Sequence, residues 1–152
     1  MGGLLSRAFG GAREVSPRQE MKEAIAYFVV LMIHADGSVG DDEVNVAMGT
    51  LARCRLFSDN TNQEDFALLT RMERKMQQDA DGLTGHYAQV LAQDGWKYTA
   101  AAILSDIMLS DGDIDQDEVR LLKMLCDRAG ITEDELDAIV ATVRAMRRAW
   151  TN

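Results

Sequence analysis

Apolar residues recur along most of this chain at intervals of three or four positions, the spacing that places them on one face of an α-helix. No segment shows the sustained period-two alternation of a half-buried β-strand. Ser16 and Pro17 form a start signal for the first helix, and Gly37 marks its end. That helix is apolar on nearly every side, which predicts a central and buried position.

Six further helices are predicted after Gly37, each from an apolar stripe and several also from a capping signal. Their expected ranges are about 41–55, 61–76, 84–93, 96–109, 115–130 and 132–146. The stripe that begins at Phe66 is expected to face inward, as is the one that ends at Met146. The pattern therefore predicts an all-α fold of about seven helices.

An internal repeat runs through the chain at an offset of 75 residues. Residues 34–44 (HADGSVGDDEV) align with residues 109–119 (LSDGDIDQDEV), and five positions are identical. An apolar helix precedes both copies, so the repeated unit is a helix, an acidic loop and a second helix. We expect a flexible N-terminal tail over residues 1–15 and one helical domain over 16–150. The domain would consist of two pseudo-repeated bundles, at about 18–80 and 94–150.

Composition narrows the class of partner. The chain has 152 residues, of which 47% are hydrophobic and one is proline, as expected for one mostly helical domain. Its 25 acidic and 16 basic residues give a net charge of −9, which argues against nucleic acid and anionic membrane surfaces as partners. The longest apolar run, 25–33, is far shorter than the roughly 20 residues of a membrane span. With no signal peptide apparent, we expect a cytoplasmic protein, and we expect Cys54 and Cys126 to be reduced and mostly buried.

Nine of the 25 carboxylates lie in two short segments, 36–43 and 111–118. One interpretation is helix capping, because free amides and the helix dipole stabilise acidic groups in a first helical turn. Capping accounts for Asp41, Glu43, Asp115 and Glu118. It accounts less well for the acids that end the preceding helices, Asp36 and Asp111, unless each turns forward to accept loop amides.

The other interpretation is a site for a hard cation such as Ca²⁺ or Mg²⁺, which prefers oxygen ligands. In both loops a Glu follows the Asp by seven residues, as in the second half of an EF-hand loop. The acids of the first half are missing, so a regular EF-hand is excluded and only a weak, shallow site is expected. The candidate metal ligands are Asp36, Glu43, Asp111, Asp113, Asp115 and Glu118.

A few other residues bear on function. His34, two positions before Asp36, is either a ligand or an ordinary helix-end histidine. Asp106 lies within an apolar helix and is expected at its water-facing edge or paired with a base. Arg147 and its basic neighbours fit the negative end of the last helix dipole. No spacing supports a Ser-His-Asp or Cys-His catalytic arrangement.

The paired loops HADGSVGDDEV and LSDGDIDQDEV resemble those of the TerB-like family, which includes tellurite-resistance TerB and the N-terminal domain of DjlA. The resemblance covers roughly residues 18–150. It implies an all-α fold of two related bundles and a bacterial cytoplasmic protein of tellurite or general stress resistance. It also implies an acidic patch that binds divalent cations or partners. On this chain the patch maps to Asp36, Glu43, Asp111 and Glu118.

Together with the resemblance, which implies the role in stress resistance, these features favour a non-enzymatic scaffold. Its acidic loops would bind weakly held Ca²⁺ or Mg²⁺, or the basic surface of a protein partner. The alternative is a hydrolase that uses the same carboxylates around Mg²⁺. An enzyme needs an open coordination position inside a pocket, whereas a binding module can hold its carboxylates on a flat surface.

Overall fold

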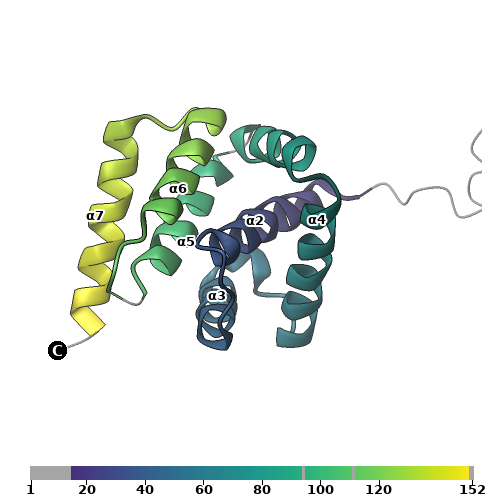
Figure 1. Cartoon of the computed structure of the whole chain (residues 1–152), viewed down its shortest axis with the longest axis horizontal. Coiled ribbons are helices and arrows are strands. Elements are labelled where there is room, and N and C mark those ends of the chain that lie inside the picture. Colours follow the sequence, from purple (N-terminus) through teal and green to yellow (C-terminus); the bar gives the residue numbers. More distant parts are fainter. Residues whose placement is uncertain (1–14, 94, 111, 151–152) are drawn as a thin grey trace, which may run out of the picture.

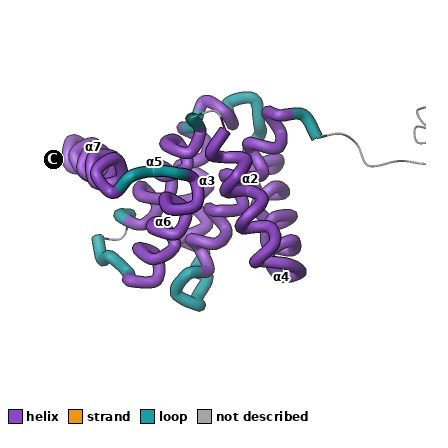
Figure 2. The backbone as a smooth tube through the Cα atoms, turned by 90° about the horizontal axis from the view of Figure 1, so that it is seen from above, coloured by secondary structure: helices purple, strands orange, loops and turns teal. Residues whose placement is uncertain are grey.

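The computed structural model describes residues 15–93, 95–110 and 112–150, and within these ranges it contains helices and loops but no β-strand (Figure 2). The elements are α2 (Pro17–His34), α3 (Asp41–Arg53), the 3₁₀ turn η1 (Arg55–Phe57), α4 (Asn62–Gln93), α5 (Trp96–Met108), α6 (Gln116–Ala129) and α7 (Glu133–Trp150). The predicted all-α class is confirmed. The expected tail over residues 1–15 lies outside the described residues, apart from Val15. No helix in the described ranges has the length and apolar character needed to cross a bilayer.

Helix α2 forms the centre of the molecule, as its apolar sequence predicts. Every residue from 21 to 30 is buried, and the most extensive packing of α2 is against α4. Figure 1 shows α2 in the middle, with α4 on one side and the α5, α6 and α7 helices on the other. The buried stretch includes two charged residues, Lys22 and Glu23, whose burial the apolar pattern does not predict.

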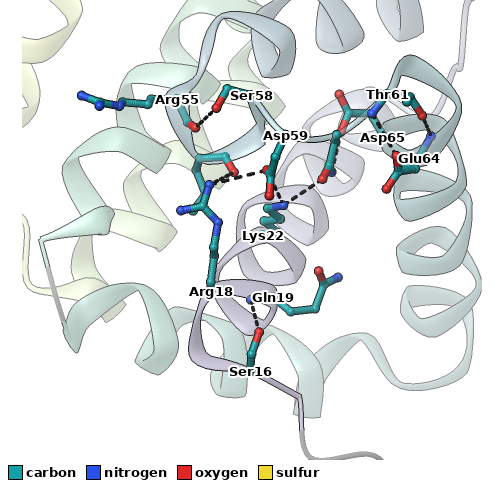
Figure 3. A network of polar contacts seen from close by, with 12 residues as sticks. Ser16, Arg18, Gln19, Lys22, Arg55, Ser58, Asp59, Thr61, Glu64 and Asp65 are labelled. Atoms are coloured by element: carbon teal, nitrogen blue, oxygen red, sulfur yellow. Dashed lines mark hydrogen bonds and ion pairs between the residues drawn. The ribbon is translucent and has the colours of Figure 1, made fainter.

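Lys22 is buried because the turn between η1 and α4 supplies its partners (Figure 3). Its Nζ donates to Asp59 Oδ1 at 2.9 Å and to Asn60 Oδ1 at 2.8 Å. Asn60 Nδ2 in turn donates to Oδ1 of the buried Asp65 at 2.8 Å. A buried ammonium is tolerated when its protons are bonded in this way, so the network joins the start of α2 to the start of α4.

Helix α4 is bent at Asp79, whose backbone is non-helical (φ −155°, ψ 75°). Asp79 Oδ1 accepts a hydrogen bond from Gly82 N at 3.1 Å, which caps the arm that follows. A Cβ at position 82 would collide with the Asp79 carboxylate, so the glycine makes room for this cap. The two arms correspond to the two helices predicted at 61–76 and 84–93, and the cap reduces the gap between them to one residue.

The 75-residue offset of the repeat recurs in the backbone. Helix α3 begins at Asp41 and α6 begins at Gln116, which are equivalent positions. Gly37 and Gly112, also equivalent, both have positive φ. Lys97, the equivalent of Lys22, donates from Nζ to Gly130 O at 3.2 Å, directly after α6, whereas Lys22 bonds the turn between η1 and α4.

Two residues expected in the core lie on the surface: Phe66 is 56% exposed and Met146 is 60% exposed. At the start of α4 the buried positions are Asp65, Leu68, Leu69 and Met72, with the spacing of one helix face. Asp65 can occupy that face because Asn60 bonds its carboxylate, and the stripe is thereby rotated away from Phe66. Met146 lies near the end of α7, a helix that packs mainly against α5 and leaves much of its surface open.

Candidate functional site

In the first acidic loop, Asp36 turns forward and bonds the loop itself. Its Oδ1 accepts from Ser38 N at 2.9 Å and from Ser38 Oγ at 3.0 Å. These bonds stabilise the anion and hold the pKa of Asp36 below its usual 3.8. The exposed Asp36 is therefore ionised and serves the turn, which is the second role that the sequence left open for it.

Glu43, in the first turn of α3, is different. The side chain is half-buried, and its Oε2 is fully buried without a hydrogen-bond partner in the described part of the chain. Gly40, the N-cap residue, has no side chain to cap this helix. An unsatisfied buried oxygen costs on the order of 1–3 kcal/mol, and more when it is charged. The first loop thus contains one carboxylate oxygen whose partner is missing.

The second acidic loop has a regular helix cap. Asp115 is the N-cap residue of α6, and its Oδ1 accepts from Asp117 N at 2.7 Å and from Glu118 N at 3.2 Å. The capping interpretation is confirmed for Asp115. Glu118 is half-buried in the first turn and Asp113 is exposed in the loop, while Asp111 lies outside the described residues.

The described candidate ligands do not form a compact cluster. Within residues 15–93, 95–110 and 112–150, no three His, Cys, Asp or Glu side chains lie close enough together to hold a metal ion. His34 is paired elsewhere, since its Nε2 lies 3.1 Å from Glu73 Oε1 on α4.

A cavity of about 490 Å³ opens beside the first acidic loop, between α2, α3 and α4. Two exposed apolar side chains line it, Val39 in the loop and Phe66 on α4. Asp41 and Glu73 supply carboxylates to the same cavity. The sequence does not predict this cavity, because its periodicity places Phe66 in the core. The stripe that excludes Phe66 begins at Asp65, a charged residue whose burial the apolar pattern does not predict.

Asp106 is paired with two bases, in agreement with the structural alternative given for it above. Its Oδ2 accepts from Arg53 Nη2 at 2.8 Å and from Thr50 Oγ1 at 2.9 Å. Its Oδ1 lies 2.8 Å from Arg147 Nε, and Arg147 Nη2 also donates to Asp106 O at 2.6 Å. The carboxylate therefore joins α3, α5 and α7 and needs no catalytic role to explain its place in an apolar helix.

The family described as Tellurite resistance protein TerB matches residues 22–146. The match covers most of the chain, from the buried part of α2 to the last turns of α7, and includes both acidic loops. No significant match was found among curated proteins or among solved structures.

Proposed function

Since the chain belongs to the TerB family of tellurite resistance proteins, we propose that it is a non-catalytic domain of the tellurite or stress response whose acidic loops bind a divalent cation. One observation carries the proposal: Glu43 Oε2 is buried and has no hydrogen-bond partner among the described residues. A divalent cation bonded to this oxygen would remove the cost of its burial.

The remaining acids of the loops suit a weak site. Asp36 and Asp115 both use Oδ1 for their hydrogen bonds, so their Oδ2 atoms can approach a cation without breaking the turn or the cap. In the first loop the ligands would be Asp36 and Glu43. In the second they would be Asp111, Asp113, Asp115 and Glu118. The small number of protein ligands predicts an affinity near the millimolar end of the calcium range.

Thermal unfolding in CaCl₂, compared with NaCl at equal ionic strength, tests the first loop. We expect calcium to raise the melting temperature of the native sequence by mass action. Glu43→Gln should gain less from calcium than the native sequence, because it removes a carboxylate ligand of the proposed site. The matched control is Asp42→Asn, an exposed acid next to Glu43, which should keep the calcium effect.

The second loop is tested by Asp111→Asn together with Glu118→Gln. This loop carries five carboxylates against four in the first, so we expect it to bind first. The double variant should therefore lose more of the calcium-dependent rise than Asp36→Asn with Glu43→Gln. A calorimetric titration without heat for Ca²⁺ or Mg²⁺, together with an unchanged melting temperature, would refute the cation site.

A second candidate function is the binding of a basic protein surface, and the cavity beside the first loop favours it. Exposed Phe66 and Val39 offer apolar contact, while Asp41 and Glu73 attract cations. A helical peptide of Leu and Lys should bind with an affinity that falls with added salt. Phe66→Ser should weaken that binding about tenfold. Met146→Ser, an equally exposed apolar site on α7, is the control and should not.

The alternative of a Mg²⁺-dependent hydrolase gains no support from the family match. Hydrolysis at a metal needs an ion with an open coordination position inside a pocket. We therefore keep binding, not hydrolysis, as the proposal.

A further inference from the structure

A second and larger cavity, of about 810 Å³, lies between α3, α5 and α7, and no described residue of the acidic loops lines it. Its volume falls within the range of small-molecule sites, about 300–1,000 Å³. The apolar part of the lining is formed by Cys54, Trp96, Ala102, Ile103, Val143 and Met146. Three arginines, Arg53, Arg55 and Arg147, also line the cavity, which we call the arginine groove.

The charge of the arginine groove is opposite to that of the protein. Three guanidinium groups and one carboxylate, Asp106, line it, which leaves an excess of positive charge in a chain of net charge −9. Two of these arginines come from α3 and the turn after it, and the third from α7. The fold therefore gathers cations that are far apart in the sequence at one apolar cavity.

The arginines differ in how they are held. Asp106 fixes Arg53 and Arg147, with N–O distances of 2.8 Å to each. The Arg53 side chain is nevertheless 71% exposed, so part of its guanidinium faces solvent. Arg55 makes no side-chain hydrogen bond or ion pair with any described residue, and in Figure 3 its side chain extends away from the Lys22 network. A guanidinium without a partner is suited to binding a carboxylate in two-point contact.

Part of the apolar lining is also exposed to solvent. Met146 is among the most exposed large apolar side chains of the described residues, and it borders the groove beside Val143. A purely ionic ligand would leave this surface in water, and a purely apolar one would leave Arg55 without a partner. A molecule with an apolar body and one anionic head would cover the apolar lining and pair with the Arg55 guanidinium.

We propose that the arginine groove binds a small amphiphilic carboxylate. Its apolar body would lie against Trp96, Ile103 and Met146, and its head would contact Arg55 and the exposed part of Arg53. This site is distinct from the acidic loops and does not depend on the function proposed for them.

Dodecanoate, titrated into the full chain carrying Trp150→Phe, tests the proposal. The chain has two tryptophans, so the variant leaves Trp96, which lines the groove, as the fluorescent reporter. We expect a saturable change in emission and a rise in melting temperature. Dodecyltrimethylammonium, with the same tail and a cationic head, and acetate, with the head alone, should produce neither effect.

Two substitutions at exposed positions locate the site. Arg55→Glu and Met146→Asp should each weaken dodecanoate binding at least about tenfold, while Arg74→Glu, an equal charge change at an exposed site on α4, should not. Unchanged thermal unfolding of the three variants without ligand shows that they are folded. Equal affinity for the cationic amphiphile, no saturation up to about 1 mM, or equal binding by Arg55→Glu and Arg74→Glu would each overturn the proposal.

Discussion

Gly37 and Gly112 have the same left-handed backbone, with φ of +80° and +84°, at equivalent positions of the two acidic loops. A Cβ built on either glycine would meet no atom within 4 Å, so space is not the reason for the glycine. The reason is the backbone itself, because an L-residue in this region costs roughly 1–2 kcal/mol. Both loops therefore need glycine directly after the aspartate in order to turn into the next helix.

Gly37→Ala and Gly112→Ala should each lower the free energy of unfolding by about 1 kcal/mol. The control is Gly49→Ala inside α3, where the Cβ also has open space and φ is not positive. It should raise the free energy of unfolding by about 0.5–1 kcal/mol, because alanine favours a helix interior. Urea denaturation measures all three, and a Gly37→Ala variant as stable as the native sequence would contradict the strain argument.

The Lys22–Asp59 pair should make the free energy of unfolding depend on pH in the acid range. The hydrogen bond from Lys22 is the largest cause that lowers the pKa of Asp59 below its usual 3.8. A carboxyl with a lowered folded pKa stabilises the fold above 3.8, and the contribution disappears as pH falls through the folded pKa. Lys22→Met should therefore be less stable than the native sequence at neutral pH, with a gap that narrows below pH 3.8.

Lys123→Met, which removes an exposed lysine of α6, is the matched control for that experiment and should show little loss of stability. Urea denaturation across the acid range gives the free energy of unfolding for each variant. A gap between Lys22→Met and the native sequence that stays constant down to the lowest pH would show that Asp59 does not carry the effect.

Among the charged residues between α3, α5 and α7, Asp106 should cause the largest loss of unfolding free energy when it is substituted. Its side chain is 16% exposed and joins Arg53 and Arg147. We expect Asp106→Ala to lower the free energy of unfolding by about 2 kcal/mol, since it leaves two guanidinium groups side by side. Arg53→Ala should cost less than about 1 kcal/mol, because Arg53 is largely exposed. Denaturation that ranks the two variants in the opposite order would refute this account.

The two thiols should differ in reactivity. Cys126 is buried, and burial is the main cause that raises its pKa to about 11 from 9.0. Cys54 is less deeply buried than Cys126, although neither thiol is in the exposed class, in line with the expectation that both are mostly buried. Since only the thiolate reacts, a shift of this size lowers the reactive fraction of Cys126 roughly 100-fold near neutral pH.

Dithionitrobenzoate labelling of the Cys54→Ser and Cys126→Ser variants under native conditions measures that difference. Cys54, the thiol that remains in Cys126→Ser, should react first. Cys126, the thiol that remains in Cys54→Ser, should react slowly until denaturant is added. Equal rates in the two variants would mean that Cys126 is more accessible than the structure shows.

Local sequence signals predicted much of the fold. The capping signal at Ser16, the two DG turns and the apolar stripes place each helix close to its observed range. The N-cap role of Asp115 was likewise readable, since its partners are the amides two and three residues ahead. These features depend on neighbours in the sequence, which is why pattern and spacing are sufficient for them.

Features that depend on distant partners were not predictable in this way. Lys22 is buried through residues 37 and 38 positions away, and Asp106 is paired with Arg53 and Arg147, respectively 53 and 41 positions away. Likewise, spacing along the chain could not show that Glu43 Oε2 is left without a hydrogen-bond partner. The arginine groove exists only because three helices meet, so the sequence predicted neither its shape nor its charge.

Because α4 is bent at Asp79, both of its arms contact α2. A straight helix of 32 residues would be about 48 Å long and would run past α2. Instead, the first arm pairs Arg71 with Glu23 at 2.8 Å, and the second arm brings Thr84 Oγ1 within 2.8 Å of Tyr27 Oη. Neither arm can detach without exposing the middle of α2. The amides of α2 and of both arms should therefore exchange with deuterium as one cooperative unit, released together only when the whole domain opens.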